Sequence, residues 1–192
     1  MTAYLDSLYG DLAASVSAAE SQKAELLKAA RAIASSIAKG GTVLICGNGG
    51  SAAEAQHFAA EFVGRFLSER PGLPAVSLAA DSSKLTAIGN DYGFKEVFAR
   101  QVRALGRPGD VLWAMSTSGT SPNVLEALKA AREKGLATVF MCGRELSDMG
   151  AADIVILSPA PSTPRIQELH LFYGHAVCEL CDRILFDPEA QA

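Results

Sequence analysis

The sequence predicts an α/β fold, with a five-stranded parallel sheet flanked by helices and a long helical segment before it. Short apolar runs alternate along the chain with longer segments of helical periodicity, which is the element order of parallel α/β sheets. The runs are continuously apolar, as is typical of strands covered on both faces. With 192 residues, 49% of them hydrophobic, the chain can bury a substantial core, and we expect residues 1–192 to form a single domain.

The first part of this prediction concerns residues 1–40, which read as helix. Apolar residues recur there at intervals of three and four in two stretches, 5–16 and 26–37. Two consecutive glycines end the pattern, and a break near Ser21 would divide the segment into two helices. One face of a small sheet cannot cover this much apolar surface, so we expect part of it to pack on another subunit.

The rest of the chain supplies the strands and the helices that connect them. The expected strands are residues 42–46, 74–79, 111–115, 137–142 and 154–157. The expected helices are residues 52–66, 84–90, 95–105, 122–134 and 164–185. Ligands of open parallel sheets bind beyond the carboxyl ends of the strands, so the loops that directly follow the apolar runs are where a site is expected.

The loop after the first expected strand is rich in glycine and reads Gly47-Asn48-Gly49-Gly50-Ser51. Its glycines allow a sharp turn and close approach of a ligand, and its serine suits the cap of the helix that follows. The spacing differs from the G-x-G-x-x-G of a dinucleotide site, and the lysine of a Walker A loop is absent. An ordinary turn between a strand and a helix remains an alternative.

The loop after the third expected strand holds five hydroxyls in six residues, Ser116-Thr117-Ser118-Gly119-Thr120-Ser121. Ser121 suits the N-cap of the next helix and Pro122 its first position. Free N–H groups and the positive end of the helix dipole then face the loop, which makes a phosphate site that needs no lysine. A solubilising loop with a routine cap would explain Ser121 but not the other hydroxyls, so we favour phosphate binding.

Composition argues against two classes of partner. The net charge is −4 and no run of Lys and Arg is longer than two, which gives little electrostatic support for binding nucleic acid. No apolar stretch approaches the roughly 18 residues that span a bilayer, and the N-terminus lacks the pattern of a signal peptide. We therefore expect a cytoplasmic protein with neither nucleic acid nor a membrane as partner.

The cysteines and one histidine read as core residues. Cys46 and Cys142 end apolar runs and are expected to be buried thiols. Cys178 and Cys181 form a C-x-x-C inside a helical pattern, and no second pair completes a zinc site, so packing is favoured over a redox or structural-zinc role. His170 lies alone on a half-apolar helix and is expected to be a hydrogen-bonded core residue.

Beyond these local patterns, the motifs taken together resemble a known family. The Ser-Thr-Ser-Gly loop and the Gly-Asn-Gly-Gly-Ser loop are similar to those of sugar isomerase (SIS) domains, whose fold is a three-layer sandwich. The resemblance to one family within them, the phosphoheptose isomerases, covers nearly the whole chain. The further segments that carry it are residues 55–61, Arg65, residues 70–72, 89–94 and 165–170, and His175.

This resemblance implies a function, an assembly and a set of site residues. The family interconverts sedoheptulose 7-phosphate and D-glycero-D-manno-heptose 7-phosphate, which leads to the heptose of bacterial lipopolysaccharide or other surface glycans. It implies a homotetramer with active sites between subunits, in which residues 1–40 would make oligomer contacts, and a zinc ion. The implied substrate-binding residues are Asn48, Gly49, Gly50, Ser51, Glu61, Arg65, Asn90, Asp91, Ser116, Thr117, Ser118, Ser121 and Gln167, with the serines and threonine on the phosphate.

Moving a carbonyl between C1 and C2 requires one group to carry a proton between the carbons, through an enediol, and another to exchange protons with the oxygens. The resemblance assigns Glu61 to the first role and His175 to the second, and it places zinc on His57, Glu61, Gln167 and His175. His57 and Glu61 are four residues apart and share a helix face, which suits two ligands. Gln167 and His175 are separated by about 12 Å of helical rise, so they must converge or come from different subunits.

Other readings stay open. A paralogue of the family binds the bacterial replication initiator protein, but the positions that match Glu61 and His175 are not Glu and His there, so this chain favours the enzyme. Another phosphosugar isomerase or a sugar-phosphate sensor would share the phosphate loop.

Single residues also have alternative roles. Glu61 could be a surface carboxylate paired with Arg65, and Asn90-Asp91 could be an ordinary turn. Some relatives carry an acid where this chain has Pro164, so no role of that acid carries over.

Overall fold

The computed structural model describes residues 1–144 and 152–187. Its five strands are β1 (Val43–Cys46), β2 (Ala75–Ser77), β3 (Val111–Ser116), β4 (Ala137–Cys142) and β5 (Ile154–Leu157). They form one parallel sheet in the order β2-β1-β3-β4-β5. The predicted five-stranded parallel sheet is therefore confirmed, with strand boundaries that differ by a few residues.

The helices follow the predicted order. They are α1 (Thr2–Ala19), α2 (Lys23–Ala38), α3 (Gly50–Val63), α4 (Ser82–Tyr92), α5 (Ala99–Leu105), α6 (Pro122–Glu133) and α7 (Thr163–Phe186). The expected break near Ser21 is a 3-10 turn, η1 (Glu20–Gln22), between α1 and α2. The helix expected over residues 95–105 is interrupted, because a second 3-10 turn, η2 (Phe94–Glu96), comes before α5. None of the described helices combines the length and apolar character needed to cross a membrane.

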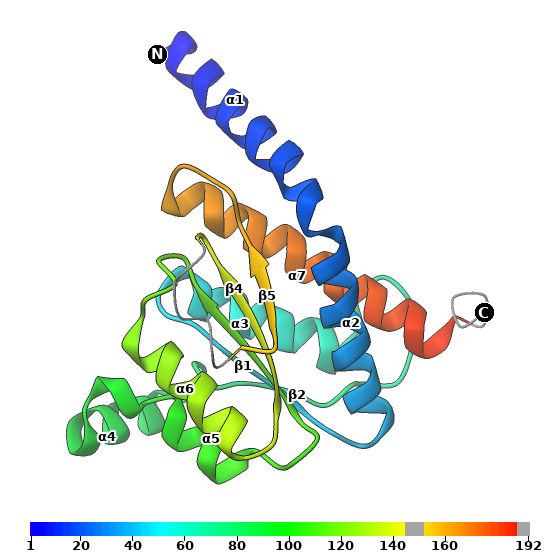
Figure 1. Ribbon diagram of the computed structural model, residues 1–192, viewed down its shortest axis with the longest axis vertical. Coiled ribbons are helices and arrows are strands. Elements are labelled where there is room, and N and C mark those ends of the chain that lie inside the picture. The colour runs from blue at the N-terminus through cyan, green and yellow to red at the C-terminus, as the bar shows by residue number, and fades with distance from the viewer. Residues whose placement is uncertain (145–151, 188–192) are drawn as a thin grey trace.

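Helices cover both faces of the sheet, which gives the expected three layers (Figure 1). The core on one face lies beneath α2, α3 and α7, where the Phe58 ring stacks on Trp113 with centroids 5.1 Å apart. The core on the other face lies beneath α5 and α6 and includes Phe98, Leu128 and Phe140. Continuous apolar strands are explained by this double cover.

The edge strand β2 departs from the prediction. The sequence indicated a strand over residues 74–79 that is covered on both faces, but the strand has three residues and Val76 is 41% exposed. Only β1 pairs with it among the described strands. An edge strand has a neighbouring strand on one side only, so its side chains are less buried than those of β1 or β3.

Helix α1 extends away from the sheet and projects from the rest of the chain (Figure 1). It buries Ser15 and Ala19, while Tyr9 is 75% exposed. A hydrogen bond connects it to α7, in which the Arg165 guanidinium donates to the Leu8 carbonyl at 3.1 Å. The apolar stripe that the sequence showed in this segment is thus left largely uncovered by the chain itself.

The sheet order reverses between β1 and β3. These strands are neighbours although β2 lies between them in sequence, and the sheet continues from β1 toward one edge and from β3 toward the other. Ligands of open parallel sheets bind at such a switch point, beyond the carboxyl ends of the two strands. Both loops singled out in the sequence leave the sheet at this point.

Candidate active site

The loops after β1 and β3 are joined by a reciprocal pair of amides. Asn48 Nδ2 donates to Asn123 Oδ1, and Asn123 Nδ2 donates to Asn48 Oδ1, each at 2.8 Å. Asn123 is buried in the first turn of α6. The sequence reasoning did not single it out, although an amide two residues after the Ser121 cap was a signal. The pair ties the glycine-rich loop to the hydroxyl-rich loop.

The hydroxyls of the second loop form a cluster. Ser116 Oγ lies 2.9 Å from Ser121 Oγ and 3.3 Å from Ser118 Oγ, and the Thr120 N–H donates to Ser118 Oγ at 3.1 Å. Ser121 is the N-cap residue of α6 and Pro122 follows it, as predicted, but the Ser121 hydroxyl makes no capping bond. It faces Ser116 instead, so the hydroxyl does not occupy an N–H group at the start of α6, although the Val124 N–H donates to the Ser121 carbonyl at 3.1 Å.

A cation that the sequence reasoning missed stands at the rim of this loop. Arg144 follows β4, and its Nε donates to the Ser118 carbonyl at 3.2 Å. The neighbouring Gly143 N–H donates to the Thr117 carbonyl at 3.2 Å. A basic residue from the end of a different strand therefore lies at the rim of the predicted phosphate loop. The signal was its position directly after another apolar run.

The glycine-rich loop is also tightly built. Gly49, at φ 55°, is the N-cap of α3, so the helix begins at Gly50 and the buried Ser51 lies inside its first turn. The prediction that Ser51 caps this helix is wrong, because the helix starts before it. A Cβ at Gly50 would collide with the Gln167 amide of α7. Gln167 therefore lies against the start of α3.

Glu54, one turn into α3, is a carboxyl that the sequence reasoning passed over. Burial raises the pKa of Glu54 to about 7, although a hydrogen bond with Ser51 acts in the opposite direction. Its Oε2 is buried and has no hydrogen-bond partner among the described residues. The spacing of four and seven residues puts Glu54 on the helix face of Gly50 and Glu61. It lies between the two groups of predicted site residues.

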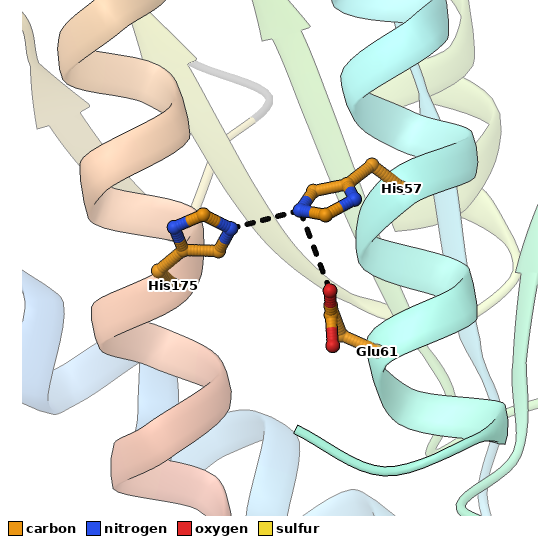
Figure 2. Close-up of side chains that lie close together, drawn as sticks. All are labelled: His57, Glu61 and His175. Carbon is orange, nitrogen blue, oxygen red and sulfur yellow. Dashed lines mark hydrogen bonds and ion pairs between the residues drawn. The ribbon is translucent and has the colours of Figure 1, made fainter. Parts of the chain in front are cut away.

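The second group is where α3 meets α7, and Figure 2 shows His57 and Glu61 of α3 facing His175 of α7. His57 Nε2 lies 2.8 Å from His175 Nε2 and 3.5 Å from Glu61 Oε1. One ligand atom from each of the three residues lies within 4.8 Å of the others. The two predicted catalytic residues and His57, which are three of the four predicted zinc ligands, therefore come together within a single chain.

A missing side chain allows α3 and α7 to approach so closely. A Cβ at Gly174 of α7 would overlap the ring of Phe58, which is itself held against Trp113. The ring of His175 lies beside Phe66, with centroids 5.4 Å apart, and edge-on to Phe58 at 6.3 Å. Aromatic packing thus fixes the imidazole that faces His57.

The three residues suit a divalent metal such as zinc. Two imidazole nitrogens and a carboxylate oxygen are the donor set of catalytic zinc sites, which keep a further position open. Nitrogens bound to tetrahedral zinc lie about 3.3 Å apart, so the 2.8 Å between His57 and His175 would have to widen slightly. The side chain of Gln167, the fourth implied ligand, lies against Gly50. Gly50 precedes His57 by seven residues, which is about 10 Å of helical rise along α3.

Three other predicted substrate residues lie on the surface. Arg65 follows the end of α3 and pairs with Glu69 at 3.7 Å, so its alternative pairing with Glu61 does not occur. Asn90 donates to Asp91 at 2.8 Å in the last turn of α4, which is helix rather than the turn considered from the sequence. Within one chain their side chains bond to these neighbours rather than to either cluster.

The four cysteines are buried and free, as expected. Burial raises the pKa of Cys46 to about 12 and that of Cys142 to about 11, and it raises the pKa values of Cys178 and Cys181 further, so these thiols stay protonated at neutral pH. His170 is fully buried, but neither ring nitrogen has a partner among the described residues, so its expected hydrogen bond is absent. Burial lowers the pKa of His170 to about 4.

A hydroxyl-lined loop at the switch point of a three-layer parallel sheet is the arrangement of a sugar isomerase domain. The family model described as the SIS domain matches residues 8–143 of the chain. This match covers β1, β3 and both loops that the amide pair joins.

Similar proteins narrow the class further. A phosphoheptose isomerase from Solidesulfovibrio magneticus is 57% identical over 165 residues, which is 85% of this chain and 81% of that protein. The structure of phosphoheptose isomerase from Neisseria gonorrhoeae matches with a TM-score of 0.87 and 43% identity, over 94% of this chain and 98% of that one. The structure of a phosphoheptose isomerase from Francisella tularensis also matches with a TM-score of 0.87, at 32% identity, over 95% of this chain and 98% of that one. The chain belongs to the phosphoheptose isomerase family of SIS domains.

Proposed function

We propose that this chain is an aldose–ketose isomerase that converts sedoheptulose 7-phosphate to D-glycero-D-manno-heptose 7-phosphate through an enediol. The observation that carries the proposal is the convergence of Glu61 and His175 from α3 and α7. A carboxylate and a histidine are the two kinds of group that the proton transfers need. The names of the relatives supply the substrate class, and the role in heptose biosynthesis in the bacterial cytoplasm follows from the family resemblance.

The two loops at the switch point would hold the phosphate end of the sugar. Ser116, Ser118 and Ser121 gather their hydroxyls beside the start of α6, whose N–H groups and dipole favour an anion. Arg144 adds a positive charge at the rim. The proposed phosphate residues are Ser51, Ser116, Thr117, Ser118 and Ser121, and the proposed sugar residues are Asn48, Gly49, Gly50, Glu61, Arg65, Asn90, Asp91 and Gln167.

At the other end of the sugar, Glu61 would take a proton from C1 or C2. The electron pair of that C–H bond becomes the second bond of the enediol, and Glu61 then returns the proton to the neighbouring carbon. Meanwhile His175 would exchange protons with the two oxygens. Because Oε1 of Glu61 faces His57, the other carboxylate oxygen is left for the carbon-bound proton.

We also propose a zinc ion held by His57, Glu61 and His175, with Gln167 implied by the resemblance. The donor set of the three convergent residues supports this site. When bound, zinc would polarise the substrate oxygens and stabilise the charge of the enediolate. His57 would then act as a ligand rather than as an acid or a base.

A homotetramer with sites between subunits is the assembly we propose. Glu61 lies eleven residues after Gly50, which is about 16 Å of rise along α3. Within a single chain, the catalytic residue Glu61 is therefore far from the glycine-rich loop that is proposed to help hold the phosphate. A substrate reaches both more readily if they come from different subunits. Residues 1–40 would supply contacts, because Tyr4, Leu5 and Tyr9 are exposed and an apolar groove of about 510 Å³ runs between the end of α1 and α7.

Incubation of the purified full chain with sedoheptulose 7-phosphate tests the proposal, with the aldose product followed by NMR. Turnover is expected, either as purified or after zinc is added. No turnover under both conditions would contradict an isomerase. The alternative of a binding protein for the replication initiator is not favoured, because Glu61 and His175 are both present and face one site.

A further inference from the structure

The buried Arg70 connects the two helices that carry the catalytic pair. Its side chain is 3% exposed, and its Nε donates to Asp182 Oδ1 of α7 at 2.8 Å. Its terminal nitrogens donate to four carbonyl oxygens, those of Glu61 (2.8 Å), Phe62 (2.7 Å), Gly64 (3.1 Å) and Pro71 (3.2 Å). One guanidinium therefore bonds to the end of α3 and to α7 at the same time.

Two of these carbonyls, those of Glu61 and Phe62, belong to the last turn of α3, where a helix leaves its carbonyls without a partner. The last four carbonyls of an α-helix have no partner within it, and α3 ends at Val63. Arg70 supplies donors to two of them, at Glu61 and Phe62, and places a positive charge at the negative end of the helix dipole. The planar guanidinium presents its donors in a fixed fork, so these bonds also fix the direction of the last turn.

The pair of Arg70 and Asp182 lies close to the proposed chemistry. Asp182 follows His175 by seven residues, two turns of α7, and Cys178 lies between them on the same face. Burial raises the pKa of the Cys178 thiol, and the negative charges of Glu61 and Asp182 raise it further. The Glu61 carboxylate and the Asp182 carboxylate therefore act on one shared region between α3 and α7.

We propose that Arg70 is a positioning residue for the isomerase site: together with Asp182 it locks the last turn of α3 onto α7 and so holds Glu61 at its place opposite His175. Arg70 touches no reacting atom in this role. A lysine would keep the charge beside Asp182, but a single ammonium cannot replace the fork that reaches Asp182 and the α3 carbonyls together. The catalytic part of this inference rests on the proposed function.

The kinetic test compares Arg70→Lys and Asp182→Asn with a matched control, Asp110→Asn. Asp110 is also a buried aspartate, but it accepts hydrogen bonds from the Thr42 and Arg107 N–H groups at the amino edge of the sheet. Loss of position should lower kcat roughly tenfold to a hundredfold, with KM within about twofold because the phosphate loops are untouched. The control should keep kcat even where it loses stability.

A kcat like that of the wild type in folded Arg70→Lys and Asp182→Asn would overturn the proposal, as would an equal loss in Asp110→Asn. If Arg70→Lys does not fold, Asp182→Asn alone tests the positioning role. Asparagine has nearly the volume of aspartate, so this variant is expected to fold. Expressing kcat per folded protein and comparing it with Asp110→Asn separates positioning from general destabilisation, because unfolding lowers the apparent kcat of any destabilised variant without changing KM.

A second readout needs no turnover, so it stays informative if the wild type proves inactive and the proposed function fails. The chain has three histidines, and nitrogen-15 NMR of the metal-free protein resolves their rings. Arg70→Lys should move the ring signals of His57 and His175, whose nitrogens lie 2.8 Å apart, and leave His170 in place. Three unchanged signals, or three that move together, would overturn a positioning role.

Discussion

The Nε2 atoms of His57 and His175 lie 2.8 Å apart, although 118 residues separate the two histidines in the chain. In such a contact one nitrogen donates a hydrogen and the other accepts it, so the pair holds one proton between two rings. A metal ion that binds both Nε2 atoms replaces this hydrogen bond, and the ring that donated it then carries its hydrogen on Nδ1. The direct contact between the two histidines and a metal bound to both of them therefore exclude each other.

His57→Ala and His175→Ala should each lose the zinc of the wild-type protein, because each removes one of the three convergent donors. Metal analysis of protein prepared without chelators measures the stoichiometry. His170→Leu is the control, since His170 is buried away from this cluster and should retain the metal. A wild-type chain that binds no zinc, or a His57→Ala variant with full occupancy, would rule out the site.

Glu61→Gln and His175→Asn should each lower kcat by about two to four orders of magnitude, because each removes a proton-transfer group while keeping a polar side chain at that position. The measurement is product formation from sedoheptulose 7-phosphate by folded protein. Near wild-type turnover in either variant would remove that residue from its proposed role.

Ser121→Ala separates phosphate binding from helix capping. The Ser121 hydroxyl makes no cap, so its loss should raise KM by roughly tenfold through a lost bond to an anion. Asp81→Ala is the matched comparison, because Asp81 does cap α4 by accepting from the Lys84 N–H at 3.1 Å, and it should cost about 1 kcal/mol. Denaturation and kinetics on both variants check this. A Ser121→Ala variant that is as destabilised as Asp81→Ala and keeps its KM would support a routine cap.

Gly174→Ala and Gly10→Ala should change stability in opposite directions. Both glycines lie inside helices, where alanine is normally favoured by about 0.5–1 kcal/mol. A Cβ at Gly10 meets nothing within 4 Å, whereas one at Gly174 overlaps the Phe58 ring and should cost about 1–3 kcal/mol. Urea denaturation measures both. A stabilised Gly174→Ala protein would show that the contact of α3 with α7 is looser than described.

His170 should make the fold sensitive to acid. Burial lowers the pKa of His170 to about 4, whereas an unfolded histidine titrates near pH 6.5, so between these values only the unfolded chain takes up the proton. The contribution of His170 to the free energy of unfolding is fully present above about pH 6.5 and is lost as the pH falls toward 4. The total loss in the free energy of unfolding is about 3 kcal/mol. Denaturation of wild type and His170→Leu across this range should show a shallower loss in the variant. Parallel curves would mean that His170 titrates normally in the folded protein.

The sequence by itself determined the elements and the chemistry of the loops. Continuous apolar runs marked all five strands, and the Ser121-Pro122 pair marked the start of α6 to the residue. Both are local signals, because burial on two faces and the geometry of a helix start act on neighbouring residues. Boundaries were less exact: Gly49 starts α3 ahead of Ser51, and β2 is a short edge strand.

Only the tertiary structure decided which of these parts meet. The order of the strands placed β1 beside β3, and so joined Asn48 to Asn123 across 75 residues. The close packing of α3 on α7, possible because Gly174 has no side chain, joined His57 to His175. Such contacts depend on strand order and on how side chains fit across distant segments. Periodicity and turn residues describe neighbours along the chain, so they carry no information about either.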